Sequence, residues 1–185
     1  MMRVILLAIL CVSTVRAEVD HTKLNADVFC MAQNIYHEAR NQSVAGQYAV
    51  GLVVLNRKAD GRFPHSICGV TTQGEHRRSW RDKKILVPIR NRCHFSWYCD
   101  GVSDSIHDMK RWNYIVKLSK YMLSNKKLID ITDGATHYHA TYVLPDWAES
   151  KTKTGRIDDH IFYRWEKRPI DLEREKQLRK EGKIP

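Results

Sequence analysis

Apolar residues first recur at helical spacing between positions 28 and 39. The stripe consists of Val28, Met31, Ala32, Ile35 and Ala39. This spacing is that of one helix face, so it predicts a core-facing helix of about four turns. In a helix, Glu38 would lie beside the buried stripe and His37 on the side away from it.

Two further helices follow from the same kind of pattern. From about residue 44 the apolar arc is wide, which predicts a mostly buried helix that ends before the stop signals Gly61 and Pro64. A third helix is predicted at about residues 106–123. The stretch between them, from about residue 63 to 101, has no period and is predicted to be a long, ordered, irregular segment of the kind that often carries function.

Strand spacing is found only later, in "ATHYHATYV" at residues 135–143. His137 and His139 alternate with Tyr138, which places the histidines on one face and the tyrosine on the other. A partner strand is predicted at 160–166 after a polar loop. The sequence therefore predicts an α+β fold, a single compact domain in which helices pack with a small antiparallel β-sheet.

The two ends of the chain have different patterns. A basic start, a short apolar run and small residues before Ala17 predict a signal peptide at 1–17. An uncleaved membrane anchor is the alternative, but the run is far short of the ~20 residues of a spanning helix. We expect the domain at 18–165 to be secreted, periplasmic or in the cell envelope, and 166–185 to be a charged, solvated tail or helix.

Export changes the meaning of the cysteines, because four of the five remain after cleavage and an oxidising compartment favours disulfides. Three pairings exist. We favour Cys93 with Cys99, which are close in sequence, and therefore Cys30 with Cys68. A zinc site is the alternative, but the chain has no CxxC pair.

The charge balance suggests a class of partner. Of the 31 Lys and Arg residues, 29 remain after cleavage against 21 Asp and Glu, a formal charge of +8. Such a protein attracts anionic polymers such as a bacterial envelope. Nucleic acid fits the charge but not the compartment.

The stretch "NIYHEARNQ" at residues 34–42 comes close to a zinc-protease motif. That motif needs a second histidine four residues after His37, and position 41 is Asn. Another metal site could use His137, His139 and His160, although paired strand histidines more often bind substrate. A Ser or Cys nucleophile has no supporting motif. We therefore expect neither a metal nor another cofactor.

A glutamate at the edge of a buried helix suits acid catalysis, because desolvation raises its pKa. Glycoside cleavage normally needs a second carboxylate, yet Gln42 occupies the nearest helical step from Glu38. One acid suffices where the 6-hydroxyl of N-acetylmuramic acid attacks its own anomeric carbon. The alternative is that Glu38 is a surface charge paired with Arg40 or Arg57.

Several segments together resemble the SleB-type cell wall hydrolase family, over roughly residues 28–164. They are "CMAQNIYHEARNQSVAGQYAVGLVVLNR", "ICGV", "CHFSWYCDG" and "GATHYHATYVLPDWAESKTKTGRIDDHIFYR". The resemblance implies a lysozyme-like catalytic domain that cleaves peptidoglycan glycan strands between N-acetylmuramic acid and N-acetylglucosamine, by a lytic transglycosylase reaction. It also implies that Glu38 is the catalytic acid and then base.

The chain departs from the family pattern at two places. The family commonly has Gly-Glu after EAR, where this chain has Asn41 and Gln42, and it usually has Gly where this chain has Asp158. The first departure removes a second acid near Glu38, and the second reshapes a turn.

The leading hypothesis is a monomeric, peptidoglycan-cleaving glycosidase with Glu38 as its catalytic residue. The expected substrate-binding residues are Tyr138, His139, Ser96, Trp97, Trp147 and Asn56. Asn56 and Arg57 would either orient Glu38 or cap the second helix. The alternatives are a metal-dependent amidase or peptidase that uses His137, His139 and His160, and a non-catalytic peptidoglycan-binding module.

Overall fold

The computed structural model describes residues 24–184, so the signal peptide predicted at 1–17 lies outside the described residues. No helix in the described range is both long enough and apolar enough to cross a membrane. The main helices are α1 (Ala26–Ala39), α2 (Val44–Ala59), α4 (Met109–Ser124) and α5 (Pro169–Lys180).

Helix α1 forms where its apolar stripe predicted it. The Asn25 side chain accepts a hydrogen bond from the backbone N–H of Asp27 at 2.8 Å and caps the helix. Met31, Ala32 and Ile35 are fully buried against α2 and α4. The stripe therefore anchors α1, and Glu38 lies in its last turn.

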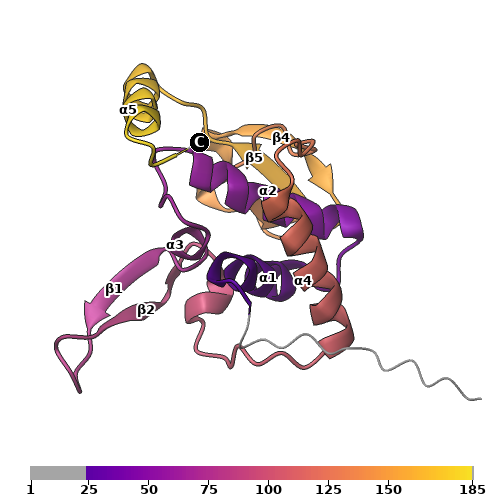
Figure 1. The fold of residues 1–185 in the computed structure, drawn as a ribbon, viewed down its shortest axis with the longest axis vertical. Coiled ribbons are helices and arrows are strands. Elements are labelled where there is room, and N and C mark those ends of the chain that lie inside the picture. Colours follow the sequence, from indigo (N-terminus) through magenta and orange to yellow (C-terminus); the bar gives the residue numbers. More distant parts are fainter. Residues whose placement is uncertain (1–23, 185) are drawn as a thin grey trace, which may run out of the picture.

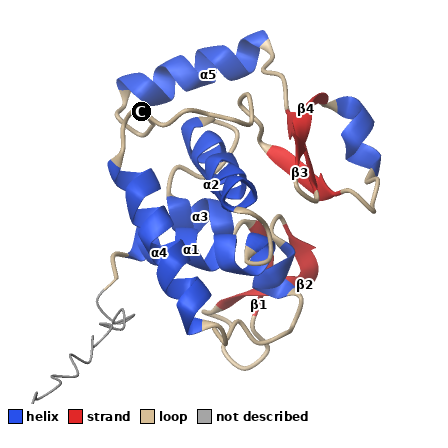
Figure 2. Cartoon of the chain, turned by 90° about the vertical axis from the view of Figure 1, so that its right-hand side faces the viewer, coloured by secondary structure: helices blue, strands red, loops and turns tan. Residues whose placement is uncertain are grey.

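Helix α2 is buried on two sides, which explains its wide apolar arc. Val50 and Val54 belong to the core shared with α1 and α4, whereas Ala49 and Val53 pack against Phe162 of the sheet. Figures 1 and 2 accordingly show α2 between the α1–α4 pair and the β3–β5–β4 sheet. The helix joins the two halves of the domain.

The sheet confirms the predicted antiparallel pair and adds a strand. Strand β3 (His137–Ala140) pairs with β5 (His160–Arg164), with Tyr138 opposite Phe162. Strand β4 (Thr152–Ile157) pairs with the other edge of β5, in the stretch that the sequence predicted to be a polar loop. That prediction was wrong because β4 is mostly exposed and has no apolar face to produce an alternating pattern.

The stretch from 63 to 101 is also more regular than predicted. It contains α3 (Ile67–Thr71), the antiparallel strands β1 (Gly74–Arg78) and β2 (Leu86–Cys93), and the short 3-10 helix η2 (Ser96–Cys99). Figure 1 shows the hairpin of β1 and β2 extending away from the helices. Its period was hidden because little of either strand is buried.

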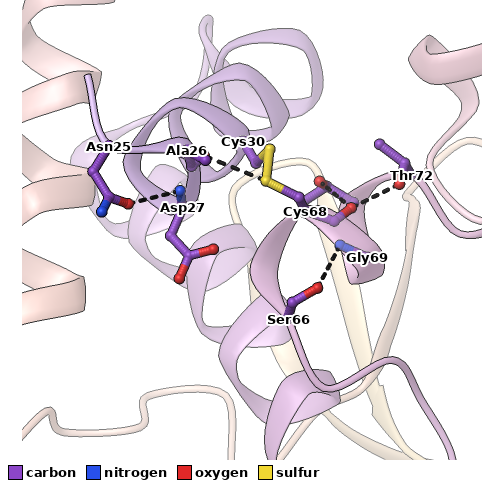
Figure 3. The surroundings of a disulfide bond; sticks show 9 residues. Asn25, Ala26, Asp27, Cys30, Ser66, Cys68, Gly69 and Thr72 are labelled. Atoms are coloured by element: carbon purple, nitrogen blue, oxygen red, sulfur yellow. Dashed lines mark hydrogen bonds between the residues drawn. A yellow bond between two sulfur atoms is a disulfide. The ribbon is translucent and has the colours of Figure 1, made fainter. Parts of the chain in front are cut away.

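Both favoured disulfides form, and they exclude a zinc site at these cysteines. Cys30 of α1 is joined to Cys68 of α3, and Cys93 at the end of β2 is joined to Cys99 of η2. Figure 3 shows the first bond beside the start of α1 and the Ser66 side chain, which caps α3. The two disulfides tie the hairpin and its neighbours to the helical core.

The C-terminal segment is a helix with one docked side rather than a fully solvated appendage. Glu175 of α5 is buried and accepts hydrogen bonds from Lys167 and from Arg179. Ile184 is buried as well. A Cβ at Gly61 would clash with Leu178, so α5 rests closely on the turn after α2.

Candidate active site

A cleft of about 870 Å³ opens where α1, η2 and β3 meet. Its lining includes Glu38 and Tyr138, together with Ser96 and residues of the loop from Asp100 to Asp108 that precedes α4. Its volume lies within the range of 300–1,000 Å³ that is typical of ligand sites.

Glu38 is half-buried in this cleft and accepts a hydrogen bond from Tyr138. The Tyr138 hydroxyl donates to Oε2 of Glu38 at 3.0 Å. Burial raises the pKa of Glu38 above its ordinary value, although this hydrogen bond and the positive charge of Arg57 oppose the rise. Burial and the Glu38 charge hold the pKa of Tyr138 well above its ordinary value, so its hydroxyl keeps its proton. The carboxyl group is thus held in place and inclined to remain protonated.

Arg57 of α2 is a buried cation behind this pair. Its Nε donates to the carbonyl oxygen of Thr136 at 2.6 Å, and its guanidinium lies over the rings of Phe95 and Phe63. Burial lowers the pKa of Arg57 to about 10, against the opposing influence of Tyr138 and Glu38. Arg57 therefore adds positive potential near Glu38 and is not an exposed salt-bridge partner of it.

His37 was predicted to lie away from the buried side, and this was wrong. Its ring stacks on that of Trp97 at 5.0 Å and lines the cleft. The stack exists because η2 brings Trp97 to the end of α1, where the indole Nε1 donates to Oδ1 of Asn34 at 3.0 Å. Burial lowers the pKa of His37, so the ring tends to be neutral.

The other predicted substrate residues divide into two groups. Ser96 is exposed in the cleft, and Trp97 and His139 contribute to its lining. Asn56 instead donates to Oδ2 of Asp130 at 2.9 Å, so it neither reaches Glu38 nor caps α2. Trp147 lies against His139 and Tyr163 and does not line this cleft.

The three histidines proposed as metal ligands do not converge. The register places His137 and His139 on the face of the sheet opposite to His160, which follows the face of Phe162 and Tyr138. The Nε2 atom of His139 is 3.0 Å from the Tyr163 hydroxyl. Burial and nearby cations lower the pKa of His137 to about 3. No group of potential ligands within residues 24–184 could hold a metal ion.

The sequence reasoning missed three acidic residues that line the cleft. Asp100, Asp104 and Asp108 recur four residues apart and all line the cleft. Oδ1 of Asp100 accepts a hydrogen bond from the N–H of Val102, and Oδ1 of Asp108 accepts one from Arg111. Burial lowers the pKa of His37, and the negative charge of Asp104 opposes this by favouring the protonated ring. The signal that could have revealed these residues is the repeated Asp spacing in "DGVSDSIHD".

The two departures from the family pattern lie next to each other. The Nε2 atom of Gln42 donates to Oδ2 of Asp159 at 3.3 Å, and the N–H of Asp159 donates to Oε1 of Gln42. Asp158 has a φ of +50°, where Gly is favoured, and its carboxylate accepts hydrogen bonds from the N–H and hydroxyl of Ser43 at the start of α2. Gln42 therefore faces the turn between β4 and β5, and it does not line the cleft.

A half-buried carboxyl group held in an open cleft is what general acid catalysis requires. A model of the Cell Wall Hydrolase family matches residues 41–163. The chain belongs to this family, and the resemblance identified in the sequence is confirmed. The matched range begins three residues after Glu38, so the match by itself assigns Glu38 no role.

Two relatives agree with this assignment. A spore cortex-lytic enzyme of Halalkalibacterium halodurans is 28% identical over 137 residues, which cover 74% of this chain and 34% of that enzyme. The spore cortex-lytic enzyme of Bacillus subtilis is 44% identical over 46 residues, 25% of this chain and 15% of that enzyme. The chain thus spans about a third or less of these relatives.

The fold is similar to the catalytic domain of the germination-specific lytic transglycosylase SleB from Bacillus anthracis. The TM-score is 0.53 at 22% identity, over 79% of this chain and all of that domain. This similarity confirms the predicted α+β fold class.

Proposed function

We propose that the chain is a peptidoglycan-cleaving glycosidase and that Glu38 is its catalytic acid and base. The observation that carries the proposal is the half-buried Glu38 carboxyl group, whose pKa is raised by burial and which is fixed by Tyr138 within the cleft. The relatives' names, which describe cortex-lytic and lytic transglycosylase enzymes, support the choice of substrate.

In the proposed reaction, protonated Glu38 donates to the oxygen that links N-acetylmuramic acid to N-acetylglucosamine. The resulting carboxylate then removes the proton of the muramyl 6-hydroxyl as that oxygen bonds to the anomeric carbon. The products are an N-acetylglucosamine end and a 1,6-anhydromuramic end. The proton returns to Glu38, and no water is consumed.

Hydrolysis is the second candidate, and the position of Asp104 favours it. Asp104 lies in the same cleft, so it could serve as the second carboxylate that activates water. Mass spectrometry of digested sacculi distinguishes the two candidates. Anhydromuramic ends that persist in Asp104→Asn support the transglycosylase, whereas reducing ends that disappear in Asp104→Asn support hydrolysis.

The role of Glu38 is tested by Glu38→Gln, with Glu149→Gln on an exposed site outside the cleft as the control. We expect a loss of about 100-fold to 10,000-fold in cleavage for Glu38→Gln only. Undiminished cleavage would exclude Glu38 as the acid. Binding to sacculi without any released sugar, in the parent chain, would instead support a binding module.

A further inference from the structure

The hairpin of β1 and β2 concentrates positive charge outside the cleft. Residues 74–93 contain seven Lys and Arg against two Asp and Glu, a net charge of +5 out of +10 for the whole chain. Because the hairpin extends away from the helices, this charge is presented to solvent on a projecting element (Figure 1).

The end of the hairpin also exposes three large apolar side chains, which we call the apolar tip. Trp80 is 70% exposed, Ile85 54% and Leu86 62%. Single exposed apolar residues are common on protein surfaces, but three around one turn form a patch that indicates interaction.

The turn that presents the apolar tip is internally bonded. The N–H of Ser79 donates to the carbonyl oxygen of Ile85 at 2.8 Å, and the N–H of Ile85 donates to that of Asp82 at 3.0 Å. The Asp82 side chain accepts a further hydrogen bond from the N–H of Lys84 at 2.9 Å. These bonds hold the turn in one shape without using the apolar side chains, which remain exposed to a partner.

Most of the cations of the hairpin form no ion pair with an acidic residue in the part of the chain that the structure describes. Arg92 forms an ion pair with Glu75, and both side chains are largely exposed. That pair lies at the base of the hairpin, next to the paired residues Gly74 and Cys93. The cations near the tip make no ion pair with any residue in the described range; they are Arg77, Arg78, Arg81, Lys83 and Lys84. An anionic partner would therefore meet uncompensated charge.

We propose that the hairpin is a membrane-binding element that docks on an anionic phospholipid surface. Trp80, Ile85 and Leu86 enter the boundary between headgroups and acyl chains, and the surrounding Lys and Arg bind the lipid phosphates. Arg81 already lies over the Trp80 ring at 4.8 Å, so its charge stays beside the aromatic anchor.

Two other partners fit the hairpin less well. A hydrated anionic polymer would satisfy the charge, but it offers no apolar environment in which burying Ile85 and Leu86 is favourable. A second copy of the chain would bring together two hairpins of the same positive charge, and Lys and Arg along edge strands oppose strand pairing. A lipid interface uses both features at once.

Co-sedimentation of the full chain with vesicles tests the proposal. The vesicles contain phosphatidylcholine, either alone or mixed with phosphatidylglycerol. We expect the parent chain to partition only onto the mixed vesicles. Partitioning should fall by about 10-fold or more in Trp80→Ser/Ile85→Ser/Leu86→Ser. It should fall about fivefold for each charge removed in Lys83→Gln/Lys84→Gln. Ile129→Ser/Ile170→Ser, at exposed sites elsewhere, is the matched control.

A second measurement does not depend on how the triple variant folds. Brominated lipids in the mixed vesicles should quench tryptophan emission of the parent chain, and Trp80→Phe should remove most of that quenching. The proposal is overturned if the parent chain does not bind the mixed vesicles. It is also overturned if the triple variant partitions like the parent chain while both bind dextran sulfate, because the partner is then an anionic polymer.

Discussion

The hydroxyl of Tyr138 lies 3.0 Å from Oε2 of Glu38, although the two residues are 100 positions apart in sequence. Glu38 comes from the last turn of α1 and Tyr138 from β3, so packing on both sides of α2 produces this contact. The hydrogen bond favours the carboxylate, while burial favours the protonated acid and prevails.

Removing the Tyr138 hydroxyl should therefore move the pH dependence of cleavage. In Tyr138→Phe the pKa of Glu38 rises further, because a donor to the charged form is lost. We expect the alkaline limb of kcat/KM to move to higher pH. The maximum should fall about 10-fold to 100-fold because the carboxyl group loses its fixed orientation.

The control for this prediction is Tyr142→Phe, since Tyr142 is 86% exposed at the rim of the same cleft. Its pH profile should match that of the parent chain. An unmoved or acid-shifted alkaline limb in Tyr138→Phe would contradict the assignment of that limb to Glu38.

Glu38 should also make stability depend on pH. Its pKa is raised in the folded state, so the stability it contributes is complete below the unfolded-state pKa and is lost as the pH rises through the folded-state pKa. Gln cannot titrate. Thermal unfolding should therefore show Glu38→Gln gaining stability relative to the parent chain as the pH rises above the ordinary pKa of a glutamate, about 4.3, toward the raised folded-state pKa. A constant difference would mean that the folded protein does not perturb this carboxyl group.

The two disulfides should differ in their effects. The Cys30–Cys68 bond closes a separation of 38 residues and the Cys93–Cys99 bond one of 6. Chain entropy predicts losses of about 4 and about 2 kcal/mol when each pair is replaced by Ala. Denaturant unfolding measures both.

The shorter disulfide should nevertheless matter more for activity. Cys93 lines the cleft beside His94 and Ser96, and its bond fixes η2 to the end of β2. At a temperature where both variants are folded, turnover should fall more in Cys93→Ala/Cys99→Ala than in Cys30→Ala/Cys68→Ala. The reverse order would show that this rim does not position substrate.

Restoring the family's acid at position 42 should not improve activity. Gln42→Glu would bring a carboxylate next to Asp159 and leave the cleft unchanged, so we expect about 1 kcal/mol of destabilisation and unaltered turnover.

Adding Asp159→Asn to Gln42→Glu should recover that stability, because the neutral amide can donate to the new carboxylate. Asn41→Gly, at the neighbouring exposed departure, is the control. Increased turnover in Gln42→Glu would show that this position does contribute an acid to the reaction.

Periodicity was sufficient where an element buries one face. Helix α1 and the β3–β5 pair were predicted correctly because each buries apolar residues at regular spacing, such as Ile35 in the helix and Phe162 in the sheet. The hairpin and β4 were missed because neither buries a regular face. Strand pairing there is set by backbone hydrogen bonds, which the side-chain pattern does not record.

The candidate site was predictable only where it depends on the periodicity of a buried element. The position of Glu38 beside the apolar stripe follows from helix geometry. The places of His37 and Asp104 depend on where η2 and the loop before α4 run, and those paths are set by tertiary packing. Trp147 could not be placed from sequence because both faces of the sheet carry aromatic residues. The Trp147 ring packs on His139 and does not line the cleft.

Strand β2 contains eight residues and ends at the cleft rim, where Cys93 is covalently fixed to η2. At about 3.3 Å per residue it spans roughly 26 Å. For a chain held by its hairpin tip, this length would set the height above the lipid surface at which glycan strands are cut. Deleting two facing residues from each strand would lower that height by roughly 7 Å. The depth of wall that the enzyme reaches would then depend on strand length and not on the chemistry of Glu38.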